Sequence, residues 1–162
     1  MLRVIKILLS LAIAFICIVY AAQNLANLSQ ALGAVGYVMG NVGHEVYPAS
    51  IGPSLTSPFM VGAALAIIIT LEFAAGLSAL KGGWDLFAAR KADAGQFDAA
   101  KRWVYIGAGL AMLVWFGLFH GIGGAFFQQW QTQAGDGSLT GAFWYGAIPA
   151  MIAVYLAVVP DD

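Results

Sequence analysis

Charged side chains are scarce in this chain. Only 9% of its 162 residues are charged and 61% are hydrophobic, whereas about 25% of the residues of an ordinary soluble domain carry a charge. Such a composition excludes an ordinary soluble domain and predicts an integral membrane protein. The formal net charge of -1 offers no basic surface for nucleic acid. The length has room for one membrane domain, 1–162, and leaves none for a separate soluble domain.

Cysteine and the common catalytic motifs are also lacking. The single cysteine, Cys17, has no partner for an internal disulfide, and its apolar surroundings favour a core or lipid-facing position over a role as a ligand. The sequence contains no HExxH or CxxC motif, no nucleophile elbow and no P-loop. We therefore expect a protein that is not an enzyme and that uses no cofactor and no metal.

Four apolar runs are long enough to cross a bilayer. A helix rises about 1.5 Å per residue and the hydrocarbon core is about 30 Å thick, so roughly 20 residues span it. The first run follows a basic start, as in a secretory signal peptide, but it is longer than the apolar part of such a peptide, which favours a retained helix. The sequence predicts an all-α fold, a four-helix transmembrane bundle with helices at about 4–22, 58–80, 103–122 and 142–159.

The segment 23–57 is half-polar and too interrupted to span the membrane. Between 27 and 39 its apolar residues recur at steps of three and four, which predicts a short amphipathic helix at the membrane surface. Pro48, Gly52 and Pro53 then indicate a loop before the second spanning helix.

Basic residues are missing from two of the three connections between the predicted spans. All seven lie at the start of the first span or between the second and the third: Arg3, Lys6, Lys81, Arg90, Lys91, Lys101 and Arg102. Because cytoplasmic loops are rich in Lys and Arg, this pattern predicts that both termini are cytoplasmic. The expected location is the bacterial inner (cytoplasmic) membrane, with several crossings.

One ionisable residue, Glu72, lies inside an apolar run. If Gly82 and Gly83 end its helix after Lys81, Glu72 lies about 13 Å from the cytoplasmic end, in the inner half of the membrane. A carboxyl group there is expected to be neutral or hydrogen-bonded to a neighbouring helix. The nearest polar side chains are expected to be Ser10, Ser78, Tyr105 and Tyr155.

Three interpretations of Glu72 are open. The first is a polar contact that joins two helices, because polar side chains often connect membrane helices. The second is a proton relay or ion path. The third is contact with a partner subunit or a quinone-like ligand.

The two histidines are the candidate ligands. His120 lies near the outer end of the third predicted helix and His44 lies in the first outer loop. Haem ligation by both would require the loop to supply one axial ligand. An interfacial hydrogen-bonding histidine is the first interpretation of His120, and ligand binding by His120 and His44 is the alternative.

The loop after the third predicted helix combines aromatic rings with glutamines. The rings are typical of an aromatic belt at headgroup level. The amides offer hydrogen bonds to a partner protein or a lipid headgroup, which makes the loop a candidate docking surface. The residues concerned are Phe126, Phe127, Gln128, Gln129, Trp130 and Gln131.

Three segments give the chain a resemblance to a known family. They are the exit of the first helix, 22–25 (Ala-Gln-Asn-Leu), Glu72 in the second helix, and 123–132 (Gly-Gly-Ala-Phe-Phe-Gln-Gln-Trp-Gln-Thr). The chain resembles, over nearly its full length, a bacterial family of predicted small integral membrane proteins whose third motif runs Gly-Gly-Glu-Trp-Phe-x-Met-Trp-Gln-Ser. Ala125 replaces the acid of that motif, so the role of that acid is absent or relocated here. The resemblance implies a four-helix membrane fold and supplies no activity.

The first functional hypothesis is a non-catalytic accessory or assembly subunit of a larger bacterial inner-membrane complex, such as a bioenergetic one. Its partners would be membrane lipids and other membrane subunits. The alternative is a small proton-coupled transporter or channel that uses Glu72. A weaker alternative is a haem- or quinone-binding electron-transfer unit.

Overall fold

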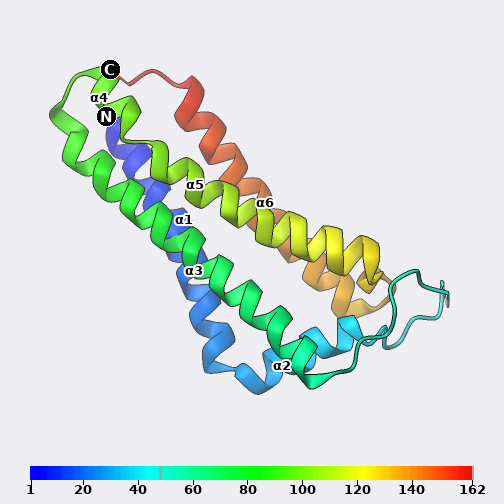
Figure 1. Ribbon diagram of the computed structural model, residues 1–162. Helices are drawn as coiled ribbons and strands as arrows, with labels where there is room; N and C mark the ends of the chain where they lie inside the picture. Colours follow the sequence, from blue (N-terminus) through cyan, green and yellow to red (C-terminus); the bar gives the residue numbers. More distant parts are fainter. Residues whose placement is uncertain (48, 162) are drawn as a thin grey trace.

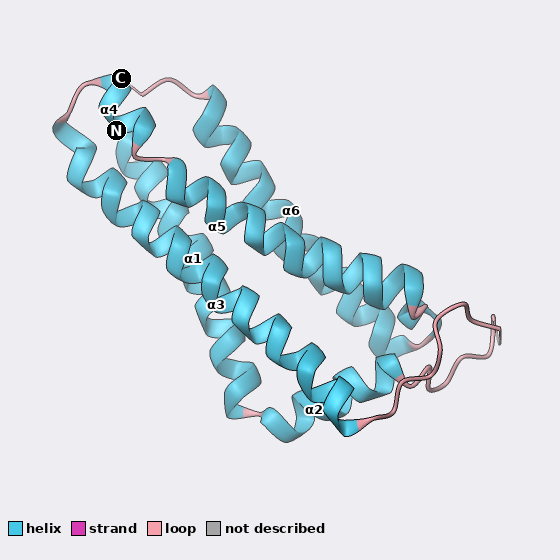
Figure 2. Cartoon of the chain, viewed as in Figure 1, coloured by secondary structure: helices cyan, strands magenta, loops and turns pink. Residues whose placement is uncertain are grey.

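Helices build the regular structure of the chain. The computed structural model describes residues 1–47 and 49–161, so Pro48, expected in a loop, and Asp162 lie outside the described residues. Within the described residues every regular element is a helix (Figure 2), and four helical stretches are long and apolar enough to cross a membrane. The predicted all-α fold with four transmembrane-capable helices is thereby confirmed. The four stretches are Leu2–Ala26, Pro58–Lys91, Ala94–Phe126 and Gln133–Val158.

Helix α1 (Leu2–Ala26) leads directly into the short helix α2 (Leu28–Met39), which agrees with the helix predicted at 27–39. Helix α3 (Pro58–Ala88) then runs back beside α1 in the opposite direction (Figure 1). Pro58 suits the first turn of α3 because its missing N–H would have no partner there. The two helices approach closely, and a Cβ added at Gly76 would lie 3.0 Å from the backbone nitrogen of Ile18.

Helix α3 does not end at Gly82 and Gly83, and the predicted end near residue 80 is wrong. A Cβ added at Gly82 would lie 2.5 Å from the backbone nitrogen of Val104, and one at Gly83 would lie 2.8 Å from Leu11 Cδ2. Both glycines are therefore points of close helix contact, which is a common use of small residues in membrane bundles. This packing offsets the cost of about 1 kcal/mol that each glycine brings to a helix interior.

The third span is assembled from several pieces. After the turn η1 (Ala89–Lys91), helix α4 (Ala94–Ala99) begins at Asp93, whose side chain accepts a hydrogen bond from the Gln96 backbone nitrogen at 2.9 Å. Helix α5 (Arg102–Met112) continues without a break into η2 (Leu113–Phe126), a π-helical segment. Such wide segments are rare and often occur at functional sites.

The last helix, α6 (Gln133–Val158), follows the turn η3 (Gln129–Gln131) and begins well before the predicted residue 142. Its start is fixed by Thr132, whose hydroxyl accepts a hydrogen bond from the Gly135 backbone nitrogen at 3.0 Å. A Cβ at Gly135 would collide with the Gln129 carbonyl oxygen, so this helix start requires glycine.

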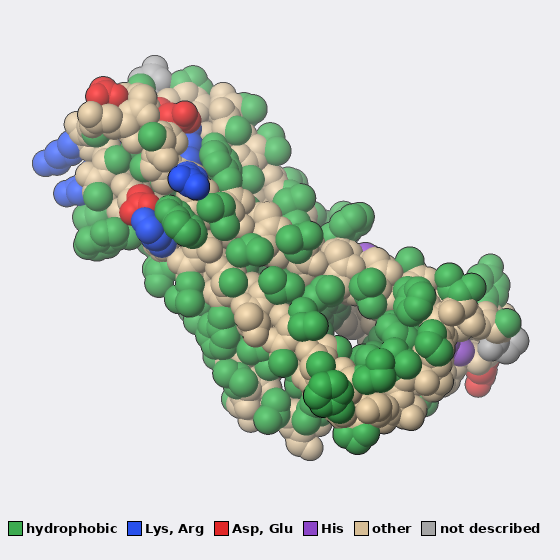
Figure 3. Space-filling view, viewed as in Figure 1, with side chains coloured by type: hydrophobic (Ala, Val, Ile, Leu, Met, Phe, Trp, Pro, Cys, Tyr) green, Lys and Arg blue, Asp and Glu red, His purple; other side chains and the backbone are tan. Residues whose placement is uncertain are grey.

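The two ends of the molecule differ. Both termini lie at one end, where Arg3 Nε donates a hydrogen bond to the Asp161 carbonyl at 2.5 Å, and the lysines and arginines visible in Figure 3 gather at that end. At the other end the pair α1–α3 diverges from η2 and α6, and α2 crosses the opening (Figure 1). Helix α2 packs on the bundle there, since Met39 lies in one apolar cluster with Val61 and Phe127.

Candidate functional site

Glu72 lies near the middle of α3, only 1% exposed. By helical rise it is about 21 Å from the first residue of α3 and about 24 Å from the last. The predicted distance of about 13 Å from Glu72 to the end of its helix is too short, because α3 continues past Gly83 to Ala88.

The partner of Glu72 is an amide from α1. Glu72 Oε2 accepts a hydrogen bond from Asn24 Nδ2 at 3.0 Å, so the pair joins α1 to α3. Ser10, one of the expected partners, instead donates its hydroxyl hydrogen bond to the carbonyl of Lys6 at 2.8 Å. Asn24 was missed because α1 was expected to end at residue 22. It ends at Ala26, and helical side chains lean toward the N-terminus, which carries the Asn24 amide toward Glu72.

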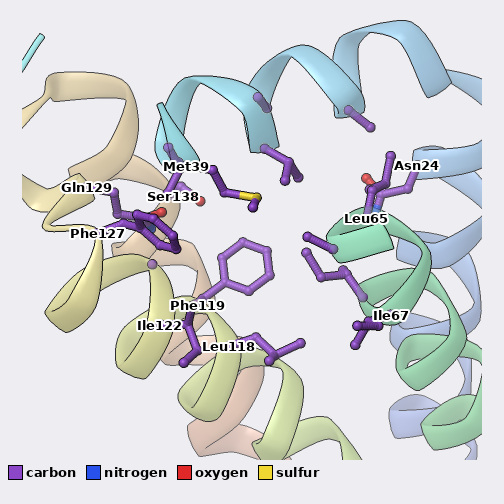
Figure 4. A pocket seen from close by; sticks show the side chains of 17 residues that line it. Asn24, Met39, Leu65, Ile67, Leu118, Phe119, Ile122, Phe127, Gln129 and Ser138 are labelled. Atoms are coloured by element: carbon purple, nitrogen blue, oxygen red, sulfur yellow. The ribbon is translucent and has the colours of Figure 1, made fainter. Parts of the chain in front are cut away.

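A cavity of about 410 Å³ lies beside Asn24, beneath α2 and between the diverging helix pairs (Figure 4). Most of its wall is apolar and comes from four elements, α2, α3, η2 and the turn that follows η2. The larger apolar side chains include Val35, Met39, Leu65, Ile68, Phe119 and Phe127.

Three polar side chains belong to the same wall. Asn24 lies on one side of the cavity, while Gln129 and Ser138 lie together on the opposite side (Figure 4). Gln129 is 4% exposed, and its Nε2 has no hydrogen-bond partner among the described residues. Gly123 makes room for this amide, since a Cβ there would lie 2.7 Å from Gln129 Oε1. The arrangement is an apolar chamber with an uncompensated amide donor in its wall.

Comparison with known proteins gives a family but no activity. Residues 2–159 match the family described as predicted small integral membrane protein (DUF2165). The chain belongs to this family. No curated protein and no solved structure shows significant similarity to it.

The three segments that carry the resemblance to the family meet at or next to the cavity. Segment 22–25 supplies Asn24 and segment 123–132 supplies Gly123 and Gln129 to its wall, while Glu72 of the second span is hydrogen-bonded to Asn24. Segments far apart in the sequence therefore converge on one site. The sequence signal that could have pointed to the site is the presence of polar side chains in these three segments.

The aromatic loop 126–131 folds back on the molecule. Gln131 Oε1 accepts a hydrogen bond from the Tyr47 backbone nitrogen at 2.7 Å, and Gln131 Nε2 donates to Gln128 Oε1 at 2.8 Å. The Trp130 ring meets the Tyr47 ring edge to face, with 5.4 Å between centroids. These contacts tie the loop to the connection between α2 and α3.

The six residues predicted as a docking surface therefore separate into two groups. Phe127 and Gln129 are buried in the cavity wall and are not available to a partner outside. Phe126 and Trp130 remain partly exposed, and Gln128 and Gln131 are half-buried, so docking at these four stays a prediction.

The two histidines occupy separate places (Figure 3). The His120 ring lies near the rings of Phe116 and Phe143, at centroid distances of 6.2 and 6.5 Å. His120 Nε2 and His44 Nδ1 are buried and have no hydrogen-bond partner among the described residues. Within the same part of the chain, no group of three or more His, Cys, Asp or Glu is placed to hold a metal ion. Ligand binding by either histidine stays a prediction.

A second buried polar cluster lies at the opposite end of the molecule, around Asp161. The Asp161 carboxylate binds Lys6 Nζ at 2.5 Å and Lys101 Nζ at 2.6 Å, and Lys101 also binds Asp98 at 3.0 Å. Burial alone would raise the pKa of Asp161, but the hydrogen bonds from Lys101 and Lys6 outweigh it and hold the pKa below the ordinary 3.8. The cluster fixes the end of the chain to α1 and to Lys101, the residue just before α5, a contact that sequence reasoning missed.

Proposed function

We propose that the protein is a non-catalytic accessory subunit of a larger bacterial inner-membrane complex and that it holds an apolar, membrane-dissolved molecule. The observation that carries the proposal is the cavity of about 410 Å³ beneath α2. Small-molecule sites are typically clefts of about 300–1,000 Å³ with apolar walls and a few placed polar groups. The cavity has this size and this lining.

The polar groups of the cavity suit binding rather than bond making. Asn24, Gln129 and Ser138 offer amides and a hydroxyl, which orient a ligand through hydrogen bonds. Covalent catalysis needs a nucleophile beside a base, and the nearby acid, Glu72, is buried and accepts the Asn24 hydrogen bond. The rings of Phe126 and Trp130 at the same end offer an aromatic contact for another subunit.

The location proposed is the bacterial inner membrane, with both termini in the cytoplasm. Support comes from the basic side chains, which gather at the end that holds both termini (Figure 3). Because cytoplasmic loops are rich in Lys and Arg, the cavity belongs to the half of the membrane that faces away from the cytoplasm.

Native mass spectrometry of the full chain in mild detergent tests the ligand. The expected result is a co-purified apolar molecule that Ala64→Trp displaces, because Ala64 lines the cavity. The matched control is Ala66→Trp, since Ala66 is exposed on the same helix and should leave the ligand in place. Equal ligand content in the two variants would exclude the cavity as the site.

Co-purification tests the accessory role. A tagged chain extracted in mild detergent should bring other membrane subunits with it, and Trp130→Ala should reduce their recovery. A stable, monodisperse particle without partners would contradict the accessory part of the proposal and leave the cavity part standing.

A second candidate is a small proton-coupled transporter, and the position of Glu72 beside the cavity favours it. Glu72→Gln should then abolish proton-coupled flux and preserve the fold, whereas unchanged flux would exclude it. The packing beyond Glu72 weighs against an open path. A Cβ at Gly107 would lie 2.7 Å from the Ala79 backbone nitrogen, so α3 and α5 leave no room between them there.

A further inference from the structure

Gln129 is a buried polar side chain of the cavity wall whose hydrogen bonding is incomplete. Its Nε2 is buried and has no partner among residues 1–47 and 49–161. Leaving a buried donor unpaired costs about 1–3 kcal/mol. The side chain lies in the cavity wall next to Phe127 (Figure 4). The amide nitrogen is covered as the side chain stands, so rotation of the side chain toward the cavity would bring it to an acceptor oxygen on a bound molecule.

The charge of the wall restricts the ligand. The polar side chains that line it, Asn24, Gln129 and Ser138, are all uncharged, and no Lys or Arg is among the described lining residues. An anionic headgroup would meet no cation there, and burying an unpaired charge is costly. The wall therefore fits an uncharged molecule better than a phosphate-bearing lipid.

The side chains that line the cavity favour a flat ring. The rings of Phe119 and Phe127 and the thioether of Met39 lie around the space (Figure 4), and aromatic and sulfur groups make favourable contacts with a ring. The volume of about 410 Å³ equals that of roughly 14 water molecules at about 30 Å³ each. That is room for a substituted ring and the first part of a tail.

We infer that the cavity binds the headgroup of a membrane quinone, with one ring carbonyl accepting a hydrogen bond from Gln129 Nε2. The ligand is uncharged, carries the missing acceptor on a flat ring, and has an apolar tail that continues into the membrane. The inference rests on the proposed ligand-holding function and identifies the ligand class. It concerns binding alone, with no electron transfer.

Titration of the purified full chain in phosphatidylcholine nanodiscs with a decyl-substituted benzoquinone tests the inference. Binding should saturate at one molecule per chain, and Gln129→Leu should weaken it about tenfold, through the lost hydrogen bond. The matched control is Gln133→Leu, because Gln133 is exposed at the start of α6 and should leave the affinity unchanged. Decylbenzene, with the same tail and no carbonyl, should bind Gln129→Leu and the unchanged chain equally.

Infrared spectroscopy with a carbonyl-labelled quinone gives a readout that a loss of folding cannot imitate. In the unchanged chain the carbonyl band should shift to lower frequency on binding, and the shift should persist in Gln133→Leu. In Gln129→Leu the carbonyl band should not shift. If Gln129→Leu folds poorly, Gln129→Met is measured in its place, and its carbonyl band should likewise not shift.

The outcomes separate the two proposals. Saturable binding of decylbenzene and the quinone with equal affinity, or a quinone affinity unchanged by Gln129→Leu, would overturn the quinone inference and leave the ligand-holding function. A phospholipid held in place of the quinone would also overturn it. If neither probe binds and Ala64→Trp displaces nothing, both proposals fail.

Discussion

At the scale of single residues, buried hydrogen bonds join distant parts of the chain. The Asn24–Glu72 pair connects α1 to α3 beside the cavity, and Asp161 connects the end of the chain to Lys6 and Lys101. Each arrangement places a carboxyl group away from water with partners from other elements. The loss of one partner should therefore cost more than the net value of the bond.

Asn24→Leu should lower the free energy of unfolding by about 1–3 kcal/mol, because it removes the donor to a buried carboxyl group. Thermal unfolding in detergent, followed by circular dichroism, measures the loss. Gln23→Leu is the control, since Gln23 is the exposed neighbour. The double variant Asn24→Leu, Glu72→Leu should recover part of the stability, because it leaves no unpaired group. No recovery would contradict a direct coupling of the two side chains.

Stability should fall in acid through Asp161. The folded pKa of Asp161 lies below 3.8, chiefly because the hydrogen bonds from Lys101 and Lys6 outweigh burial. A carboxyl group with a lowered folded pKa adds stability above its unfolded pKa and loses it as the pH falls through the folded value. Unfolding measured between neutral pH and strong acid should show this loss in the unchanged chain.

The variant Asp161→Asn isolates the contribution of this carboxylate. It should remove that part of the acid dependence and cost about 3 kcal/mol at neutral pH, since it leaves two buried ammonium groups without their shared carboxylate. Asp136→Asn, on an exposed residue in the first turn of α6, is the control and should change little. An unchanged acid profile in Asp161→Asn would show that other carboxylates dominate.

At the scale of the helices, small residues decide which spans approach. A Cβ at Gly107 would lie 2.7 Å from the Ala79 backbone nitrogen and 2.8 Å from the Ala75 carbonyl oxygen, whereas one at Gly109 would meet nothing within 4 Å. The two glycines lie on one helix, α5. They therefore give a matched pair of substitutions.

Gly107→Ala should destabilise the bundle by about 1–3 kcal/mol, because α5 and α3 must move apart to admit the methyl group. Gly109→Ala should be neutral or stabilising by up to about 1 kcal/mol, since alanine is the better helix former. The melting temperatures of the two variants in one detergent make the comparison. Equal destabilisation would show that helix flexibility, and not close packing, requires glycine in α5.

The same scale shows what the sequence could predict. Run length and apolar period were enough for the four spans and for α2, because these signals are local. These signals could not predict the role of Gly82 and Gly83, because a glycine pair can either end a helix or allow close helix packing. The neighbouring residues Val104 and Leu11 decide for packing, and they are distant in the sequence. The pairing of Asn24 with Glu72 could not be predicted for a related reason. It depends on how far α1 and α3 extend, which no local pattern specifies.

At the scale of the whole molecule, the basic side chains and the cavity lie at opposite ends. The basic side chains and both termini occupy one end, while the bridge of α2 over the diverging helices encloses the cavity at the other (Figures 1 and 3). In a membrane this asymmetry fixes which side a ligand or partner approaches from. The orientation of the chain in the membrane therefore bears on its function, and it can be tested separately.

Cysteine labelling in spheroplasts tests the orientation. In a Cys17→Ala background, Val46→Cys marks the loop between α2 and α3, and Ala99→Cys marks α4, both at exposed positions. If both termini are cytoplasmic, a membrane-impermeant maleimide should label Val46→Cys in intact spheroplasts and Ala99→Cys only after lysis. In the unchanged chain, Cys17, which is buried in α1, should stay unlabelled until the protein is denatured. The reversed pattern would turn the chain over and place the cavity in the cytoplasmic half. Labelling of both positions in intact spheroplasts would contradict a fixed spanning arrangement.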